Sequence, residues 1–426
     1  MAATRRPWPS RPDGPLKKLA PVAAALLLGG PASGDALPAA ESDALRRFTQ
    51  QALEHAEVRG AAVALVRGGN VVWTESFGVA DQRSGDPVTS STVFEAASIG
   101  KVVAAYAALA LVEEGTWSLG TPARSSRLEV EAGCDAPRLG QLLSHRAGLS
   151  NNLLAKRFLP ACRLPAPFAY AGQGWLVLQD MLEMQTAKSA ELLIQERVFR
   201  PLGMTRSSYT EPAPDGLATG HVDAVWGVIS GNADDGVVAA GVVVILLSVA
   251  LCLWANRATL QGRRLGKAVA LIALEWGALA LILVGIGFAV TVPVESWSRR
   301  TLLPSSLHSS ADDLARFAQE LVRPRLLRRE TRELLFAEQV DVGGGLAWGA
   351  GIGIDRSASP TTFWQWGSNP GFQGLLVVEP ERGDAIVVLT NTGGFLDYVN
   401  RRVGGYNMAK RVAREALGIR GRWDLR

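Results

Sequence analysis

The chain has 426 residues, of which 48% are hydrophobic, with a formal net charge of +4 and three cysteines. This length allows one large domain with insertions or two to three average domains. There is no Cys-x-x-Cys and the four histidines lie far apart, so the sequence indicates no metal site and no cofactor. An arginine cluster at 323–332 lies among leucines, which is typical of a solvated helix face rather than of a nucleic-acid-binding patch.

The first 40 residues have the composition of a secretory signal. Lys17 and Lys18 precede an apolar stretch, 19–30, and small residues follow up to position 40. A basic region, a short apolar core and a small-residue tail make up such a signal, and this core is too short to span a bilayer comfortably. Arg5 and Arg6 leave a twin-arginine signal as an alternative, which the neighbouring prolines disfavour.

The part of the chain before position 230 predicts helices and a β-hairpin. The expected elements are a helix over 42–55, strands over 61–67 and 71–77, a helix over 139–149 that ends at a glycine, a helix after the turn-rich segment 168–175, and a helix stop at 201–205. Ser144 and His145 suggest a catalytic dyad. However, adjacent residues on a helix diverge by about 100° and do not face each other, so we favour a structural role for both.

Ser98 and Lys101 are the strongest chemical signal in the chain. The apolar run 102–112 behind them has helical length and is rich in alanine, so Ser98 is expected at or just before a helix start, on one face with Lys101. A lysine among apolar side chains can have its pKa lowered until it accepts a serine proton, which arginine cannot do. Of 7 lysines, only Lys101 has a serine three residues before it. Because Ser-x-x-Lys alone is a weak motif, the case for a catalytic pair depends on the segments around it.

Two long apolar stretches interrupt the chain. Residues 236–256 carry no charge and residues 268–294 carry only Glu275, so each is long enough to cross a bilayer. The segment between them, 257–268, holds three arginines and a lysine, so the positive-inside rule places it in the cytoplasm and the flanking protein outside. Two buried core helices are the alternative, but core helices this long should show a polar face. We therefore expect a transmembrane hairpin at 236–294.

The last third of the chain predicts β-structure between two helices. Asp312 and Asp313 mark the first turn of a helix that starts at 309–314. Strands are expected over 346–354, 362–367, 371–378 and 384–390, and a final helix over 398–417. The glycine-rich run 349–353 has no helix after it, which indicates a strand rather than a dinucleotide-binding loop.

Five segments in this order resemble the serine β-lactamase-like hydrolases related to class C β-lactamases, DD-peptidases and esterases. They are Phe-x-x-x-Ser-x-x-Lys at 94–101, Leu-Leu-Ser-His-x-x-Gly-Leu at 142–149, the tyrosine motif at 168–175, Pro-Leu-Gly-Met at 201–204, and the third active-site strand at 365–372. The resemblance implies an α+β fold with an antiparallel sheet flanked by helices, a helical lobe, and the site between them. The hydrolase domain would comprise 41–230 and 300–420, with the two transmembrane helices inserted between these parts.

The resemblance also implies the chemistry. Ser98 would be acylated by an ester, amide or lactam carbonyl, and Lys101 and Tyr170 would share the proton transfers. The backbone N–H groups of Ser98 and Ser368 would bind the oxyanion. The residues implied to contact the substrate or the oxyanion are Ser98, Gly172, Gln365, Trp366, Gly367 and Ser368.

The chain departs from the family pattern at two of these positions. Gly172 stands where the family often has an asparagine that binds a substrate amide, and Gln365 stands where it often has a lysine or histidine. A neutral Gln365 cannot pair with a substrate carboxylate as a cation would. We therefore expect an extracytoplasmic, membrane-anchored hydrolase of esters or small amides and peptides of the cell envelope, rather than a true β-lactamase or carboxypeptidase. The alternative is a penicillin-binding-like receptor that binds a cell-wall or lipid ligand without turnover.

The cysteines indicate whether the domain lies in an oxidising compartment. Cys134 and Cys162 flank the predicted helix 139–149 on the side expected to be oxidising, so they are candidates for a disulfide. The sequence leaves their pairing open, because it does not show their separation. Cys252 lies within the first apolar stretch and is expected to stay free.

Overall fold

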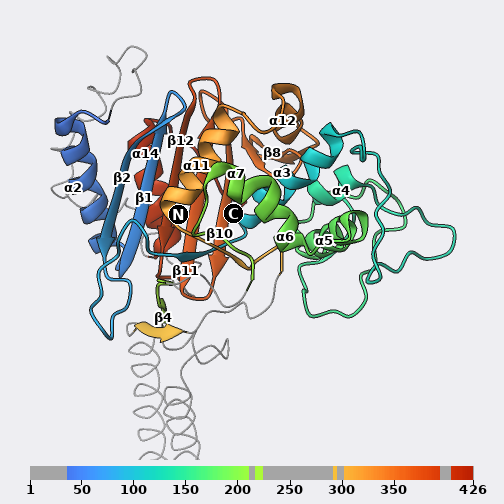
Figure 1. The fold of residues 1–426 in the computed structure, drawn as a ribbon, viewed down its shortest axis with the longest axis horizontal. Coiled ribbons are helices and arrows are strands. Elements are labelled where there is room, and N and C mark those ends of the chain that lie inside the picture. The colour runs from blue at the N-terminus through green and yellow to red at the C-terminus, as the bar shows by residue number, and fades with distance from the viewer. Residues whose placement is uncertain (1–35, 211–215, 224–290, 295–301, 394–403, 426) are drawn as a thin grey trace, which may run out of the picture.

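The computed structural model describes residues 36–210, 216–223, 291–294, 302–393 and 404–425, and its main feature is an eight-stranded antiparallel sheet (Figure 1). The strand order is β2-β1-β12-β11-β10-β9-β8-β7. The strands are β1 (Gly60–Arg67), β2 (Asn70–Gly78), β7 (Val340–Gly343), β8 (Leu346–Trp348), β9 (Gly353–Asp355), β10 (Thr362–Asn369), β11 (Phe372–Glu379) and β12 (Asp384–Thr390). Because β1 pairs with β12, residues from both ends of the chain share one sheet.

The sheet separates two hydrophobic cores, because side chains alternate between its faces. In β1, the odd-numbered residues 61–65 pack with α2 (Ala39–His55) and α14 (Gly405–Leu417). The even-numbered residues 62–66 pack with α3 (Gly100–Glu113) and α11 (Ala311–Val322). Figure 1 shows α11 crossing the near face of the sheet and α14 lying behind it. The fold is thus the predicted α+β arrangement of an antiparallel sheet flanked by helices.

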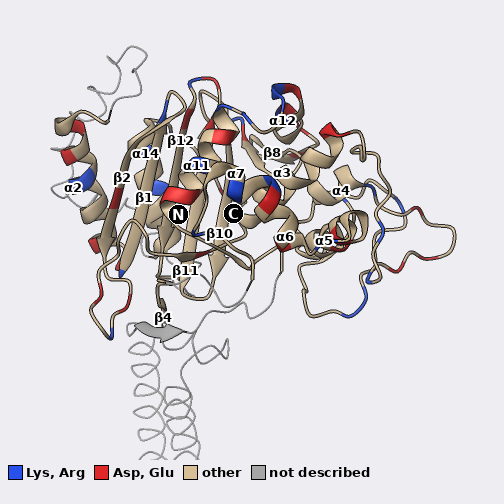
Figure 2. Cartoon of the chain, viewed as in Figure 1, with Lys and Arg blue, Asp and Glu red and all other residues tan. Residues whose placement is uncertain are grey.

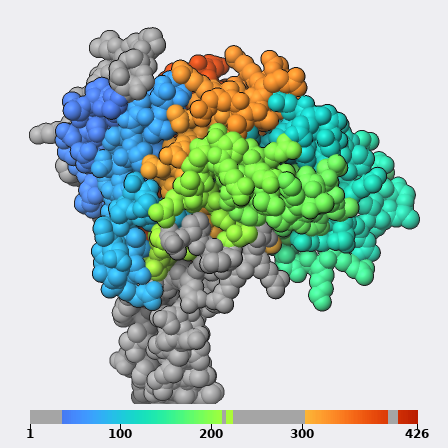
Figure 3. All heavy atoms as spheres, viewed as in Figure 1, coloured from blue at the N-terminus to red at the C-terminus, as the bar shows by residue number. Residues whose placement is uncertain are grey.

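A helical lobe packs beside α3. It consists of α4 (Leu139–Leu143), α5 (Gln173–Thr186), α6 (Ala190–Ile194), the π-helical turn η2 (Gln195–Phe199) and α7 (Arg200–Leu202). Gly203 ends α7 in the left-handed conformation, with a φ of 68°, which confirms the predicted helix stop. Cys134 and Cys162 form a disulfide with their Cα atoms 4.7 Å apart, which confirms their pairing. Figure 3 shows this lobe packed against the segment that contains α11.

Three predicted features differ in detail. The helix expected over 139–149 ends at Leu143, because His145 adopts a φ of 57° and breaks it. The strand expected over 346–354 is the pair β8 and β9, joined by a turn in which Gly351 has a φ of 108°. Within the arginine cluster, α12 (Arg329–Phe336) buries Arg332 over the ring of Phe336 instead of exposing it. The other charges lie mainly on the outer helices and loops (Figure 2).

The chain enters and leaves the predicted hairpin through two paired strands. In this pair, β4 (Gly220–Asp223) and β5 (Thr291–Val294), Asp223 lies directly opposite Thr291. The second apolar stretch was therefore predicted four residues too long, since its end at 291–294 is a β-strand. The rest of both stretches and the N-terminal signal up to residue 35 lie outside the described residues. Within the described part of the chain, no helix is both long and apolar enough to cross a membrane.

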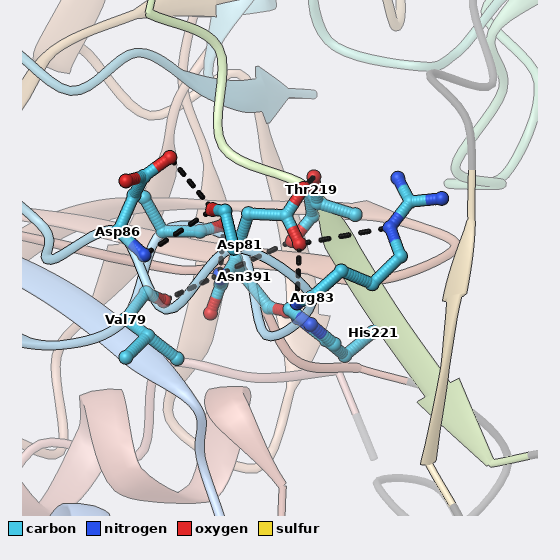
Figure 4. A network of polar contacts seen from close by, with 9 residues as sticks. Val79, Asp81, Arg83, Asp86, Thr219, His221 and Asn391 are labelled. Carbon is cyan, nitrogen blue, oxygen red and sulfur yellow. Dashed lines mark hydrogen bonds and ion pairs between the residues drawn. The ribbon is translucent and has the colours of Figure 1, made fainter.

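A polar cluster attaches β4 to the sheet. The Asn391 side chain, just after β12, donates from Nδ2 to the carbonyls of Val79, Ala80 and Thr219 at 3.0–3.1 Å. The Thr219 hydroxyl donates to Asp81 at 2.8 Å. Figure 4 shows Asn391 between two other segments of the chain, which carry Val79 and Asp81 on one side and Thr219 on the other. The segment that precedes the predicted hairpin is thereby fixed to the eight-stranded sheet.

Candidate active site

Ser98 lies where β3 (Phe94–Ala97) turns into α3. β3 is fully buried and pairs with β6 (Leu307–Ser309). Ala97 has a φ of 47°, which is an uncommon and costly conformation for alanine. The N–H of Ile99 then bonds back to the carbonyl of Ala96. This sharp turn holds the Ser98 side chain just before the helix start, which is where the sequence places it.

Lys101 lies one turn along, with its side chain 2% exposed. Its Nζ donates to Ser98 Oγ at 2.8 Å and to the carbonyl oxygen of Pro304 at 2.7 Å. Burial among the apolar residues of α3 lowers the pKa of Lys101 to about 7. A substantial fraction of this amine is therefore neutral near neutral pH, and a neutral amine beside a hydroxyl can take its proton.

Tyr170 reaches the same pair from the segment that precedes α5. Its ring centroid lies 5.1 Å from Lys101 Nζ, and its hydroxyl hydrogen-bonds with Ser98. Burial raises the pKa of Tyr170 to about 12, although the hydrogen bonds with Ser98 and Gln365 oppose this rise. Tyr170 thus keeps its proton at neutral pH and is placed to pass it on. The structure therefore brings Ser98, Lys101 and Tyr170 together.

His145 forms the wall behind Tyr170. The two rings lie 4.5 Å apart between centroids, and His145 Nδ1 accepts a hydrogen bond from the backbone N–H of Ala171 at 3.0 Å. Burial, aided by the charge of Lys101, lowers the pKa of His145 to about 3, so the ring stays neutral. Ser144 turns away and donates to the carbonyl of Gly140 at 2.6 Å. The two adjacent residues do not form a dyad, and His145 orients the tyrosine motif.

Gly367 lets the third active-site strand approach Ser98. A Cβ at this position would lie 2.1 Å from the carbonyl oxygen of Ala96, so only glycine fits between β10 and β3. β9 pairs with β10 only as far as Trp364, so this edge of β10 is not covered by β9 near Gly367 and Ser368. Such an uncovered strand edge beside a serine suits a backbone oxyanion site. The assignment of the Ser98 and Ser368 N–H groups to it stays a prediction.

Gln365 and Trp366 lie on opposite faces of β10. Gln365 is fully buried, and its Nε2 donates to Tyr170 Oη at 3.2 Å and to the carbonyl of Trp366 at 2.8 Å. Trp366 is partly exposed and stacks on Tyr170, with centroids 4.8 Å apart. Gln365 therefore contacts the Tyr170 hydroxyl, whereas Trp366 offers an aromatic surface beside the Tyr170 ring.

Gly172 has no side chain, and neighbouring residues occupy the space. Its N–H donates to Asn151 Oδ1 at 2.9 Å. A Cβ at Gly172 would lie 2.6 Å from Leu153 Cδ2 and 2.9 Å from Asn151 Oδ1, so a larger residue there would require these two side chains to shift. Leu153 thus makes this side of the tyrosine motif apolar.

The sequence did not identify Pro304, His145 or Leu153 as parts of the site. Pro304 contributes only a backbone carbonyl, which no residue type can signal, and it lies 203 positions from Lys101. His145 could have been found from its place in the Leu-Leu-Ser-His motif, to which the sequence alone suggests a structural role. The described residues also line an open pocket of about 380 Å³ between α12 and the start of β10, and this pocket contacts none of Ser98, Lys101 and Tyr170.

Comparisons with known proteins agree with this architecture. The chain is 29% identical over 182 residues to Penicillin-binding protein 4 of Amycolatopsis lactamdurans, which covers 38% of this chain and 47% of that protein. It is 27% identical over 211 residues to Esterase EstB of Burkholderia gladioli, covering 41% of this chain and 53% of the esterase. The chain thus spans about half the length of these curated relatives.

Solved structures share the fold. D-amino acid amidase from Ochrobactrum anthropi superposes with a TM-score of 0.63 at 18% identity, over 88% of this chain and 98% of the amidase. D-alanine carboxypeptidase AmpC from Burkholderia cenocepacia gives a TM-score of 0.60 at 17% identity, over 88% of this chain and 99% of that chain. The family profile described as Beta-lactamase matches residues 45–404. This match covers most of the chain, which therefore belongs to the beta-lactamase family.

Proposed function

We propose that this protein is a membrane-anchored, extracytoplasmic serine hydrolase that acts through an acyl-enzyme on Ser98. The observation that carries the proposal is the 2.8 Å contact between Lys101 Nζ and Ser98 Oγ, made by a buried lysine whose pKa falls to about 7. A hydroxyl becomes a useful nucleophile when a base of matched pKa lies within hydrogen-bonding distance. Ser98 and Lys101 meet both conditions.

In the acylation step, neutral Lys101 takes the proton of Ser98 as Oγ bonds to the substrate carbonyl carbon. The negative charge on the carbonyl oxygen is held by the N–H groups of Ser98 and Ser368. Collapse of this intermediate breaks the bond to the leaving group, which receives a proton from Tyr170, and Lys101 returns its proton to Tyr170. Water then attacks the acyl-enzyme, gives its proton to the same pair, and releases the acid and Ser98.

The surroundings of the pair favour neutral, partly apolar substrates. Gln365 is uncharged and buried behind Tyr170, so it provides no cation for a substrate carboxylate. Leu153 fills the space beside Gly172, and Trp366 is partly exposed and stacks on Tyr170. Together these residues support esters or small amides with apolar acyl groups over the carboxylates of β-lactams and D-alanyl peptides.

The proposed membrane anchor is inferred from the sequence. The sequence predicts an even number of membrane crossings, from the two apolar stretches and the basic segment between them. Both parts of the chain that form the active site would then lie on the same side of the membrane. The pairing of β4 with β5 is compatible with a hairpin that leaves and re-enters the domain at one point. The disulfide between Cys134 and Cys162 suits an oxidising compartment outside the cytoplasm. A cleft near the bilayer surface would favour amphiphilic or envelope-derived substrates.

Covalent labelling separates this proposal from its alternative. Purified protein is treated with a fluorophosphonate and, in parallel, with p-nitrophenyl esters, nitrocefin and D-alanyl peptides, with Ser98→Ala as the control. Labelling of Ser98 together with turnover of esters supports the hydrolase. Labelling of Ser98 by the fluorophosphonate without turnover of any substrate would instead support a receptor, and no labelling at Ser98 would exclude the hydrolase.

A further inference from the structure

The turn at 302–306 presents a backbone carbonyl to the catalytic lysine. Ser306 closes this turn, since its Oγ accepts from the N–H of Leu302 at 2.8 Å and its own N–H donates to the carbonyl of Leu302 at 2.9 Å. Pro304 lies between them, and its carbonyl oxygen accepts from Lys101 Nζ at 2.7 Å. The turn therefore belongs to the active site although it contributes no reactive side chain.

This carbonyl determines which way the base points. A neutral amine has two N–H bonds and one lone pair, and rotation about its C–N bond exchanges their directions. In the structure Lys101 Nζ donates to Ser98 Oγ and to the Pro304 carbonyl, and Ser98 Oγ donates to the same carbonyl at 3.2 Å. When the amine is neutral, its hydrogen bond to Pro304 restrains the rotation, so that the lone pair can face the Ser98 hydroxyl. The same carbonyl also stabilises the protonated amine, which opposes the effect of burial on the pKa of Lys101.

Asn369 holds the turn in place. Its side chain is 6% exposed, and its Nδ2 donates to the carbonyl of Ser305 at 3.1 Å and to Glu95 Oε2 at 2.5 Å. Glu95 is 1% exposed and lies on β3, three residues before Ser98. One amide group thus connects the turn that orients Lys101 to the strand that carries the nucleophile.

Gln179 supports the turn from the opposite side. Its Oε1 accepts a hydrogen bond from the backbone N–H of Leu303 at 3.2 Å, and Gln179 lies on α5 with its side chain buried. The residues on either side of Pro304 are therefore held by side chains from two different elements, β10 and α5. A carbonyl held in this way is pre-organised for its partner.

We propose that Asn369 is a positioning residue for Lys101: by tying the Ser305 carbonyl to Glu95, it keeps the adjacent Pro304 carbonyl on Lys101 Nζ. This inference rests on the proposed function, because it assigns Lys101 as the base.

The proposal predicts a shift in pH dependence. Without the Pro304 carbonyl, protonated Lys101 loses an acceptor, so its pKa falls and the amine becomes neutral at lower pH. The other ionisable groups near it are Tyr170 and His145 on the lobe side, Glu95 on β3, and His308, which lies opposite Glu95 on β6. Burial raises the pKa of Tyr170 to about 12 and lowers that of His145 to about 3 and that of His308 to about 4, so none of these three titrates near pH 7.

The chain offers a matched control in Asn391. This asparagine is also buried and its Nδ2 also donates to backbone carbonyls, at Val79, Ala80 and Thr219. Asn391 holds the chain that leads into the predicted hairpin (Figure 4). Asn369 holds the chain that follows the hairpin. Asn391→Leu therefore removes the same kind of hydrogen bonds without touching the turn at 302–306.

The experiment uses the full chain in detergent micelles. For the unsubstituted protein, Asn369→Leu, Gln179→Leu and Asn391→Leu, one measures fluorophosphonate labelling of Ser98 and hydrolysis of a p-nitrophenyl ester from pH 5 to 10, together with melting temperature. We expect Asn369→Leu to lower kcat about tenfold with little change in KM, because the base is misdirected. We also expect the acidic limb of both profiles to move down by about half a pH unit or more.

Gln179→Leu should also move the acidic limb of both pH profiles to lower pH, and Asn391→Leu should lower only the melting temperature. An unmoved acidic limb in Asn369→Leu, or an equal shift in Asn391→Leu, would overturn the positioning role while leaving the proposed function intact. Failure of the unsubstituted protein to label at Ser98 would instead overturn the proposed function itself, and the inference with it. If Asn369→Leu does not fold, the shift of the acidic limb in Gln179→Leu, compared with that in Asn391→Leu, tests the proposal instead.

Discussion

Gln365 Nε2 lies 3.2 Å from Tyr170 Oη and donates a hydrogen bond to it from a fully buried position. This donor occupies one lone pair of the phenol oxygen and so restricts the directions that the O–H of Tyr170 can take. A neutral residue at this position therefore orients the catalytic tyrosine instead of recruiting a charged substrate.

Replacing Gln365 with leucine should separate these roles. Gln365→Leu keeps most of the volume and removes the donor, so Tyr170 loses its orientation and kcat should fall about tenfold, a usual effect for a misdirected proton-transfer group. The test measures steady-state kinetics with a p-nitrophenyl ester together with the melting temperature. A lower melting temperature with an unchanged kcat would show that Gln365 contributes only to packing.

Tyr170→Phe tests the proton transfer directly. The ring and its stacking on Trp366 remain, but the hydroxyl is lost, so kcat should fall by at least about a hundredfold. The matched control is Trp366→Phe, which weakens the stack and leaves the hydroxyl. Rates measured on the same ester should distinguish the two variants, and an unchanged rate in Tyr170→Phe would show that Tyr170 acts only through packing.

Lys101 should control the pH dependence of the rate. Burial lowers its pKa to about 7, so the neutral base accumulates as the pH rises through 7, and kcat/KM should rise between about pH 6 and 8. Lys101→Arg should be inactive across this range, because arginine stays protonated. Near-normal rates in Lys101→Arg would rule out Lys101 as the base.

Much of the fold was accessible from the sequence, because local patterns carry it. The hairpin of β1 and β2 and the helix stop at Gly203 each depend on nearby residues, and both appear as predicted. Ser98 and Lys101 were found for the same reason, since a spacing of three residues on one helix is a local property.

What the sequence missed depends on contacts between distant segments. The bond from Lys101 to the Pro304 carbonyl spans 203 positions and involves a group that every residue possesses. The burial of Arg332 and the early end of α4 at Leu143 were likewise decided by tertiary packing and by one left-handed residue, His145. Local propensity does not encode such features.

The predicted topology can be tested by labelling cysteines from outside intact cells. In a Cys252→Ser background, cysteines placed at Gln82 and Ser357, which are exposed in the folded domain, should react with a membrane-impermeant maleimide. One placed at Gln261, in the basic segment between the apolar stretches, should react only after lysis. External labelling at Gln261 would contradict the transmembrane hairpin.

The central claim is that Ser98 carries the acyl group. The most direct measurement is rapid acid quenching of the protein with a p-nitrophenyl ester, followed by mass spectrometry of its peptides. We predict a burst of p-nitrophenol close to one equivalent of protein and an acyl adduct on the peptide that contains Ser98, absent in Ser98→Ala. Steady turnover with no adduct at Ser98, or turnover that survives in Ser98→Ala, would contradict the mechanism.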